Sequence, residues 1–541
     1  MAAPVPEFPA GFLWGVSASA FQIEGSLTAD GRGPSSWDAF TEEQGRVKDG
    51  SHAEVATDHY RRYREDVALM AELGVGAYRF SVSWSRVLPE GHGRVNDRGL
   101  DFYDRLVDEL CASGIAPVPT LFHWDTPLAL EERGGWLDRD TAGRFAEYAS
   151  VVAERLADRV PMWITINEPA EVTLLGYGLG EHAPGRRLVF DALPAAHHQL
   201  LAHGMGVQAL RAAGARRIGV AVSHSPVWTA GDSDDDRAAA ALYDTLTNRL
   251  FADPLLTGSY PDGLAELLPG PVAEDLRTIS APLDWYGINY YNPMLVGAPR
   301  PATDASASDA SADAGIVDSG AGSSFGGIDI PADLPFAIRQ IEGRELTDFG
   351  WPVVPEGLRE LLATLRERYG DRLPPLYITE NGCSYGDGPD PGTGRIDDAR
   401  RVAYHDGHVR ALHEAMEEGA DVRGYFIWSI LDNFEWAEGY RQRFGLVHVD
   451  YETLARTPKE SYAWYRDLIK SGRGPPGGRR PGRSRKREPR GPGLPPTAGG
   501  WARCRSPASG CGSAGSARCN CSWRGRPRPS PPTTRPRPSP W

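Results

Sequence analysis

Two glutamates stand at the ends of apolar, β-branched runs that lie far apart in the chain. Glu168 follows such a run in MWITINEPA (162–170), and Glu380 follows another in PLYITEN (375–381). A single Glu where a strand gives way to a loop is usually a solvated loop residue. Two that face each other across a pocket can instead cleave an acetal, because one carboxyl protonates the departing oxygen while the other, ionised, meets the positively charged carbon.

A metal site would use the same residue types and is the first alternative. Zinc or calcium would require further His, Cys or carboxylate ligands close by in the fold. His123 is the only obvious further candidate in the motifs near these glutamates. We therefore expect no metal and no cofactor at the site.

Both glutamates belong to a regular series of short apolar runs that are predicted to be β-strands. Eight such runs lie at 12–20, 77–84, 116–122, 162–167, 217–224, 284–291, 375–381 and 424–430. Between them the spacing is helical, and the predicted helices cover 58–73, 98–114, 142–158, 194–213, 355–369, 400–418 and 459–470.

Alternating strands and helices without hairpin signals predict an α/β fold with parallel strands joined by crossover helices. Eight such units close a single (β/α)8 TIM barrel. An open, doubly wound sheet is the alternative, and it is disfavoured because no glycine-rich phosphate turn follows any predicted strand. In such a barrel the site lies at the carboxyl ends of the strands, so Glu168 and Glu380 would face one mouth.

Polar and aromatic side chains gather at the ends of seven of the eight predicted strands. Any one of them has a structural explanation, but together they indicate a binding site at one end of the barrel. They are Gln22, Glu24, Arg79, His123, Trp124, Asp125, Asn167, Asn289, Tyr291, Asn381, Trp428, Glu435 and Trp436.

Composition divides the chain into a barrel domain at 1–471 and a basic tail at 472–541. The tail is rich in Pro, Arg and Gly, and its 16 Lys or Arg and one acidic residue give it a charge of +15, against −29 for the rest. Such a sequence cannot build a core, so we expect disorder. Its composition and abrupt onset also fit a shifted reading frame in GC-rich DNA, and its four cysteines lack the paired spacing of a zinc module.

A second unusual segment, rich in Ala, Ser, Asp and Gly, lies at 299–333. It is predicted to be a mobile, low-complexity loop insertion between the sixth and seventh strands. A neutral surface insertion is the simplest explanation, and gating of the site is the alternative.

The acidic barrel domain would repel nucleic acid and anionic membranes, so only the tail could attract them. No apolar run reaches the ~20 residues that cross a bilayer, and the N-terminal sequence does not resemble a secretion signal. Cys111 and Cys383 are too few for a disulfide framework. We therefore predict a cytoplasmic protein that acts on a small molecule, with no membrane partner. No oligomeric state is indicated.

Longer motifs follow one another in order along residues 8–470. They include FLWGVSASAFQIEG (12–25), YRFSVSWSR (78–86), FHWDTP (122–127), TINEP (165–169), GLGEHAPG (178–185), GINYY (287–291), YITENG (377–382) and DNFEWAEGYRQRFGL (432–446). In these motifs the chain resembles the bacterial β-glucosidases of glycoside hydrolase family 1. The resemblance implies a retaining (β/α)8-barrel enzyme, in agreement with the fold predicted from periodicity.

By this resemblance Glu168 is the general acid/base, and Glu380 is the nucleophile that forms a glycosyl–enzyme ester. Arg79 and Tyr291 would hydrogen-bond Glu380, and Asn167 would hold the sugar 2-hydroxyl. The other implied substrate-binding positions are Gln22, His123, Trp124, Asn289, Trp351, Trp428, Glu435, Trp436 and Phe444.

Three positions bear on the branch of the family. Glu435 would repel a phosphate dianion, which disfavours a 6-phospho-β-glycosidase, and Glu168 stands where thioglucosidases have Gln. Ala170 follows the NEP motif where many members have Trp, so the stacking of that ring on the aglycone is in doubt.

The resemblance predicts a retaining exo-β-glucosidase for cellobiose, short oligosaccharides and aryl β-glucosides, with β-galactosidase or β-fucosidase side activity. A sugar-binding barrel that has lost catalysis is a second hypothesis, and the intact pair of Glu168 and Glu380 speaks against it. A third is nucleic-acid binding through the tail, which would be sensitive to salt.

Overall fold

The computed structural model describes residues 6–299, 322–325, 328–331 and 334–472. The predicted tail lies outside the described residues except for Gly472, and with it lie Cys504, Cys511, Cys519 and Cys521. Most of the predicted insertion at 299–333 also lies outside them.

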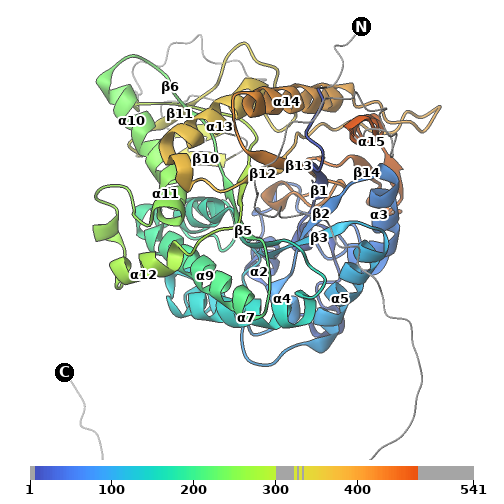
Figure 1. Ribbon diagram of the computed structural model, residues 1–541, viewed down its shortest axis with the longest axis horizontal. Coiled ribbons are helices and arrows are strands. Elements are labelled where there is room, and N and C mark those ends of the chain that lie inside the picture. The colour runs from blue at the N-terminus through green and yellow to red at the C-terminus, as the bar shows by residue number, and fades with distance from the viewer. Residues whose placement is uncertain (1–5, 300–321, 326–327, 332–333, 473–541) are drawn as a thin grey trace, which may run out of the picture. The chain divides into compact units, whose positions relative to one another are not determined.

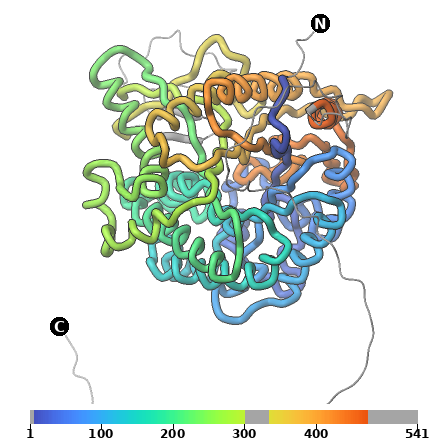
Figure 2. Tube along the Cα trace, in the orientation of Figure 1, coloured from blue at the N-terminus to red at the C-terminus, as the bar shows by residue number. Residues whose placement is uncertain are grey.

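Eight parallel strands close into one barrel, as the sequence predicts (Figure 1). The barrel strands are β1 (Leu13–Ser17), β2 (Ala77–Ser81), β3 (Ala116–Phe122), β4 (Trp163–Asn167), β5 (Ile218–Ser223), β7 (Tyr286–Asn289), β12 (Leu376–Asn381) and β13 (Val422–Trp428). They pair in this order, and β13 closes the ring by pairing with β1. In the trace of Figure 2 the blue start of the chain accordingly lies against orange segments from its C-terminal part.

Long helices between the strands surround the barrel. Those that the sequence predicts are α3 (His59–Leu73), α5 (Asp97–Ala112), α7 (Asp140–Leu156), α9 (Leu193–Ala212), α13 (Pro355–Tyr369), α14 (Ala399–Glu417) and α15 (Glu460–Gly472). In α5 the buried side chains include Leu100, Tyr103, Leu106, Val107 and Leu110, which is the apolar face that the spacing predicts. In the described part of the chain, no helix combines the length and the apolar character needed to span a membrane.

The connection after β5 contains three helices that the sequence prediction does not include. They are α10 (Asp234–Asp244), α11 (Leu250–Thr257) and α12 (Val272–Ile279). A signal was present for the first, because the Ser233 hydroxyl caps it by accepting a hydrogen bond from the Asp236 amide at 3.0 Å. Its face is rich in Ala and Asp rather than large apolar residues, so the periodic pattern is weak.

Short antiparallel pairs occur outside the barrel, although the sequence was expected to contain no hairpins. They belong to the small sheets β6 (Val227–Thr229), β8 (Met294–Gly297) and β11 (Ala337–Arg339); β9 (Gly322–Phe325) and β10 (Ile328–Pro331); and β14 (Val447–Val449) and β15 (Arg456–Pro458). Strands of three or four residues are too short to produce a readable alternation. The β9–β10 pair falls within the predicted insertion.

Single turns and irregular helices complete the loops around the barrel. The α-helical turns are α1 (Ala20–Ile23), α2 (Ser36–Glu42), α4 (Trp84–Val87), α6 (Leu128–Glu131) and α8 (Pro169–Glu171). The π-helical segments are η3 (Val172–Leu179) and η5 (Thr245–Arg249). The 3₁₀ turns are η1 (Ala29–Gly31), η2 (Gly135–Leu137), η4 (Val189–Ala192), η6 (Ala265–Leu267), η8 (Gly370–Arg372) and η9 (Trp436–Glu438).

Alternation along the strands decides which side chains enter the barrel. On β2, Tyr78 and Phe80 belong to the main apolar core, whereas Ala77 belongs to a separate small cluster. That cluster includes Val118, Ile164, Ala221, Trp285, Tyr377 and Phe426, which come from or next to different barrel strands. It therefore fills the lower barrel with apolar side chains, and Arg79, two residues after Ala77, points into the same interior one layer higher.

Gly15 shows how tightly this cluster is packed. A Cβ atom at Gly15 would lie 2.3 Å from Cδ1 of Phe426, so the phenyl ring occupies the space that any larger residue on β1 would need. The aromatic ring of one strand and the bare backbone of the next are therefore complementary.

We expect Gly15→Ala to lower the free energy of unfolding by about 1 to 3 kcal/mol, because the added methyl group would overpack the barrel interior. Urea unfolding should measure this loss. Gly388→Ala is the matched control, since Gly388 is exposed with open space around its Cβ position. Adding Phe426→Leu to Gly15→Ala should recover part of the loss, and equal unfolding midpoints for Gly15→Ala and the wild type would contradict this packing.

Candidate active site

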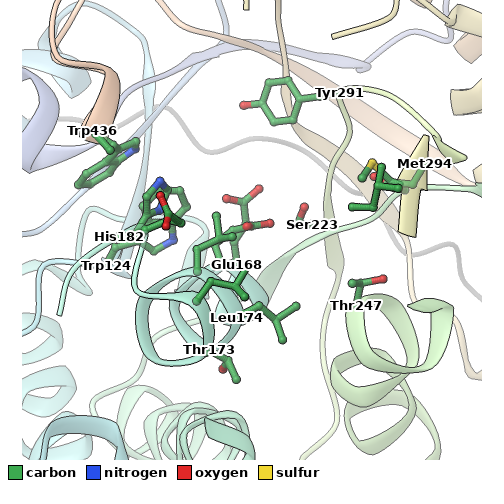
Figure 3. A pocket seen from close by; sticks show the side chains of 18 of the residues that line it. Trp124, Glu168, Thr173, Leu174, His182, Ser223, Thr247, Tyr291, Met294 and Trp436 are labelled. Atoms are coloured by element: carbon green, nitrogen blue, oxygen red, sulfur yellow. The ribbon is translucent and has the colours of Figure 1, made fainter. Parts of the chain in front are cut away.

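The carboxyl ends of the barrel strands surround a cavity of about 530 Å³ (Figure 3). Most of the residues that the resemblance implicates line it, namely His123, Trp124, Glu168, Tyr291, Trp351, Glu380, Trp428, Glu435, Trp436 and Phe444. Arg79, Asn167, Asn289 and Gln22 lie behind this wall, and each hydrogen-bonds to a residue that lines the cavity.

Glu380 is held at both carboxylate oxygens. The guanidinium of Arg79 donates to Oε1, and the hydroxyl of Tyr291 donates to Oε2 at 2.7 Å. Glu380 is 2% exposed and Arg79 is 1% exposed, so their opposite charges meet away from water. Burial and the charge of Glu380 hold the pKa of Tyr291 well above its usual value, which keeps the phenol protonated as a donor.

Glu168 has a different environment, although it lines the same cavity. Its Oε1 accepts a hydrogen bond from the Asn289 amide at 2.8 Å, and the carboxyl is only 5% exposed. Burial raises the pKa of Glu168 well above its usual value, and the charges of Glu380 and Glu171 raise it further. Glu168 therefore retains a proton when Glu380 is ionised, which suits a general acid.

The backbone at Glu168 explains how neighbouring residues reach one site. In a regular strand Asn167 and Glu168 would point to opposite faces. The pairing of β4 with β5 shifts register between Ile164 and Asn167, and Glu168 then has left-handed dihedral angles, with φ 46° and ψ 64°. This conformation is costly for a residue other than glycine, and such strain is characteristic of functional sites.

An amide network joins the two glutamates. Asn289 donates to Asn167 Oδ1 at 2.9 Å as well as to Glu168, and Arg79 donates to the same Asn167 oxygen at 2.5 Å. Asn167 is thus an internal link between the two carboxyl groups. Its predicted contact with a sugar 2-hydroxyl stays a prediction.

Aromatic rings and a second carboxyl occupy one end of the cavity. The His123 ring is nearly parallel to the rings of Trp428 and Trp436, with centroid distances of 5.7 and 5.9 Å. Glu435 Oε2 accepts a hydrogen bond from Gln22 Nε2 at 3.1 Å, and burial, with the charge of Glu380, raises the pKa of Glu435 to about 8. At neutral pH this group is therefore mostly protonated, which weakens the charge repulsion against phosphate that the sequence predicts.

His123 is neutral, because burial and the charge of Arg79 lower its pKa well below the usual value. Asn167 Nδ2 lies 3.2 Å from His123 Nε2, so Nε2 accepts and Nδ1 carries the hydrogen. In the described part of the protein this Nδ1 is buried without a partner.

Trp351 and Phe444 lie with Tyr291 in a second aromatic group. The Trp351 ring is 5.2 Å from that of Tyr291 and 6.0 Å from that of Phe444. Phe349, which the sequence does not single out, stacks on Trp351 at 4.3 Å. Tyr291 connects this group to the site, because its ring contacts Trp351 and its hydroxyl donates to Glu380.

Sequence reasoning missed Glu171, which lines the cavity together with Glu168, Glu380 and Glu435. A signal existed: Pro169 begins a helical turn, so the residue three positions after Glu168 returns to the same side. The neighbouring Ala170 is buried and is not part of the cavity wall.

No group of three or more His, Cys, Asp or Glu within the described residues is arranged to hold a metal ion. Cys383 packs with Tyr385 and Tyr404, and burial raises the pKa of its thiol to about 12. It is therefore an unreactive packing residue rather than an exposed thiolate.

Comparison with known proteins agrees with this arrangement. The family model described as glycosyl hydrolase family 1 matches residues 5–473. A β-glucosidase of Agrobacterium sp. is 44% identical over 85% of this chain and 95% of its own length. A bifunctional β-D-glucosidase/β-D-fucosidase of Bifidobacterium breve is 41% identical over 85% of this chain and 98% of its own.

Solved structures resemble the whole barrel. A family 1 β-glucosidase of Thermotoga maritima, in complex with isofagomine lactam, has a TM-score of 0.78 at 39% identity, covering 87% of this chain and 100% of that one. A psychrophilic β-glucosidase of Micrococcus antarcticus has a TM-score of 0.78 at 45% identity, covering 86% of this chain and 98% of that one.

The raised pKa of Glu435 predicts a pH-dependent effect on stability. Because the folded protein binds this proton more tightly than the unfolded chain, the Glu435 contribution to stability falls as pH rises from about 4.5 to about 8. Gln does not titrate, so Glu435→Gln should gain roughly 1 to 3 kcal/mol relative to the wild type between pH ~5 and pH ~8. Urea unfolding at both pH values measures this, with exposed Glu154→Gln as control. A pH-independent difference would exclude the raised pKa.

Proposed function

The chain belongs to glycosyl hydrolase family 1, and from that premise we propose that it is a retaining exo-β-glucosidase that hydrolyses terminal non-reducing β-D-glucosyl residues. The observation that carries the proposal is the unequal pair of carboxyl groups. Glu168 is buried with a raised pKa, whereas Glu380 accepts hydrogen bonds from a guanidinium and a phenol. One member can supply a proton while the other supplies an electron pair.

In the first step Glu380 attacks the anomeric carbon, and Glu168 protonates the glycosidic oxygen as its bond to that carbon breaks. The products are a glycosyl ester on Glu380 and a free aglycone. Forming the ester removes the charge of Glu380, which is one of the two charges that raise the pKa of Glu168. Glu168 thereby becomes a better base for the second step.

In the second step Glu168 takes a proton from water, and the resulting hydroxide displaces Glu380 from the anomeric carbon. Two inversions at that carbon give net retention. Tyr291 and Arg79 receive the Glu380 carboxylate again as it leaves, because both remain positioned as donors.

The aromatic end of the cavity supports a single terminal sugar as the bound unit. Trp428 and Trp436 offer flat apolar faces to the sugar C–H surface, and Glu435 offers polar atoms to its hydroxyls. The proposed substrates are cellobiose, short oligosaccharides and aryl β-glucosides. A β-fucosidase or β-galactosidase side activity is part of the proposal, and the name of the Bifidobacterium breve relative supports the former.

Hydrolysis of a panel of β-glycosides tests the reaction and its stereochemistry together. We expect aryl β-glucoside and cellobiose to be cleaved, with the β-anomer as the first sugar detected by proton NMR before mutarotation. A first-formed α-anomer would overturn the retaining mechanism. Folded protein that releases nothing above background would leave the sugar-binding barrel without catalysis as the better hypothesis.

The role of Glu380 can be tested by removing and replacing its carboxylate. Glu380→Gly should lower kcat by about 10³-fold or more, because no nucleophile remains. Added azide should restore cleavage of an activated aryl glucoside and give the α-glucosyl azide, since the anion attacks from the vacated side. Wild-type rates in Glu380→Gly, or a β-azide product, would show that another group is the nucleophile.

A further inference from the structure

The cavity has a second end, which we call the apolar lobe, on the opposite side of Glu168 from Trp124 and Trp436 (Figure 3). Its apolar lining is Leu174, Leu246, Met294, Leu334, Phe336 and Ile338. In the proposed reaction the sugar occupies the aromatic end, so the departing group faces the apolar lobe.

Glu171 stands at the edge of this lobe. Described residues from α8, η3, β5, α10, η5, β8 and 334–338 line this end of the cavity. Among them Glu171 is the one charged side chain. No Lys or Arg in the described ranges forms an ion pair with it. The Ser223 hydroxyl, which also lines the lobe, is the neighbour that favours the charged form of the Glu171 carboxyl.

Three other polar side chains of the lobe, Thr173, Thr247 and His224, already have partners inside the protein. Thr173 Oγ1 donates to the Pro169 carbonyl, and Thr247 Oγ1 donates to the Tyr243 carbonyl, both at 2.8 Å. The His224 ring nitrogens are bonded to Asn248 and Tyr286, at 3.0 and 2.9 Å. The Glu171 carboxylate therefore has the acceptor sites that are open to a ligand.

We propose that Glu171 is a specificity-determining residue that selects leaving groups made of an apolar ring bearing a hydroxyl donor. This inference rests on the proposed function. The ring would cover the apolar wall, and the hydroxyl would donate to the carboxylate. A hydrogen bond to a charged acceptor in apolar surroundings is stronger than the same bond in water, which gives the hydroxyl its selectivity.

Burial supports the proposal independently of any substrate. It raises the pKa of Glu171 to about 7, and the charge of Glu380 adds to the effect, so the empty site stabilises the carboxylate poorly. A ligand hydroxyl would supply the missing donor. A leaving group without one would displace water from the carboxylate and leave the Ser223 hydroxyl as its donor, which costs affinity.

A competing role for Glu171 is purely electrostatic, because its charge helps to raise the pKa of Glu168. That role would affect every leaving group that needs protonation, whatever its substituents. Selectivity between two leaving groups of similar basicity therefore separates the two roles.

The test compares phenyl β-D-glucoside with its 2-, 3- and 4-hydroxyphenyl analogues in the wild type, Glu171→Leu and Glu171→Gln. In the wild type we expect kcat/KM for at least one hydroxyphenyl isomer to exceed that for the phenyl compound by about 10- to 100-fold. Glu171→Leu should reduce this preference to within about 3-fold. Glu171→Gln, which keeps a neutral acceptor, should be intermediate.

Glu154→Gln makes the same chemical change on the exposed face of α7 and should keep the full preference. Thermal unfolding checks that each variant is folded, and Glu171→Gln preserves the test if Glu171→Leu does not fold. Equal rates on all four compounds in the wild type would overturn the inference, as would a preference that survives in both Glu171 variants. Equal losses on all four in the variants would assign Glu171 the electrostatic role. No hydrolysis by the wild type would instead refute the proposed function.

Discussion

The site depends on a guanidinium placed inside the barrel. Arg79 is among the largest fully buried side chains, and a buried charge is tolerated only when it is paired and hydrogen-bonded. Its partners are Glu380, the Thr379 carbonyl and Asn167, which come from β12 and β4. The need to satisfy one cation therefore ties the strand that carries Glu380 to the strand that leads into Glu168.

That tie gives two similar residues different chemistry. Glu380 receives a positive charge and a phenol, while Glu168 receives an amide and the repulsion of its neighbours. The difference lies in the surroundings and not in the residue type. It also makes the protonation of Glu168 responsive to the state of Glu380, so one rearrangement of charge serves both halves of a double displacement.

Much of this could be predicted from sequence because strong local patterns coincide with the barrel. The eight strands are apolar and β-branched, and side chains such as Arg79 and Glu380 stand out against them. The helices α10 and α11 escaped because their sequences lack a strong apolar stripe. The helix α12 escaped because eight residues are too few for a helical period to be read. Glu171 escaped although Pro169 signals a helical turn, because its position also depends on the left-handed backbone of Glu168, which a sequence pattern does not reveal. The internal position of Asn167 likewise follows from a register shift between β4 and β5.

The apolar cluster under the site determines how substrate enters and products leave. Phe426, Trp285 and their neighbours fill the barrel below Arg79, and the Phe426 ring packs directly against the backbone of Gly15. The pocket is therefore closed at its lower end, and substrate enters and products leave through the mouth at the carboxyl ends of the strands. In the proposed reaction the sugar sits innermost, so the aglycone has to leave first, and the water of the second step arrives through the space that it vacates. The released sugar leaves last and blocks the next substrate until it has gone. The filled lower barrel therefore fixes the order in which the products are released.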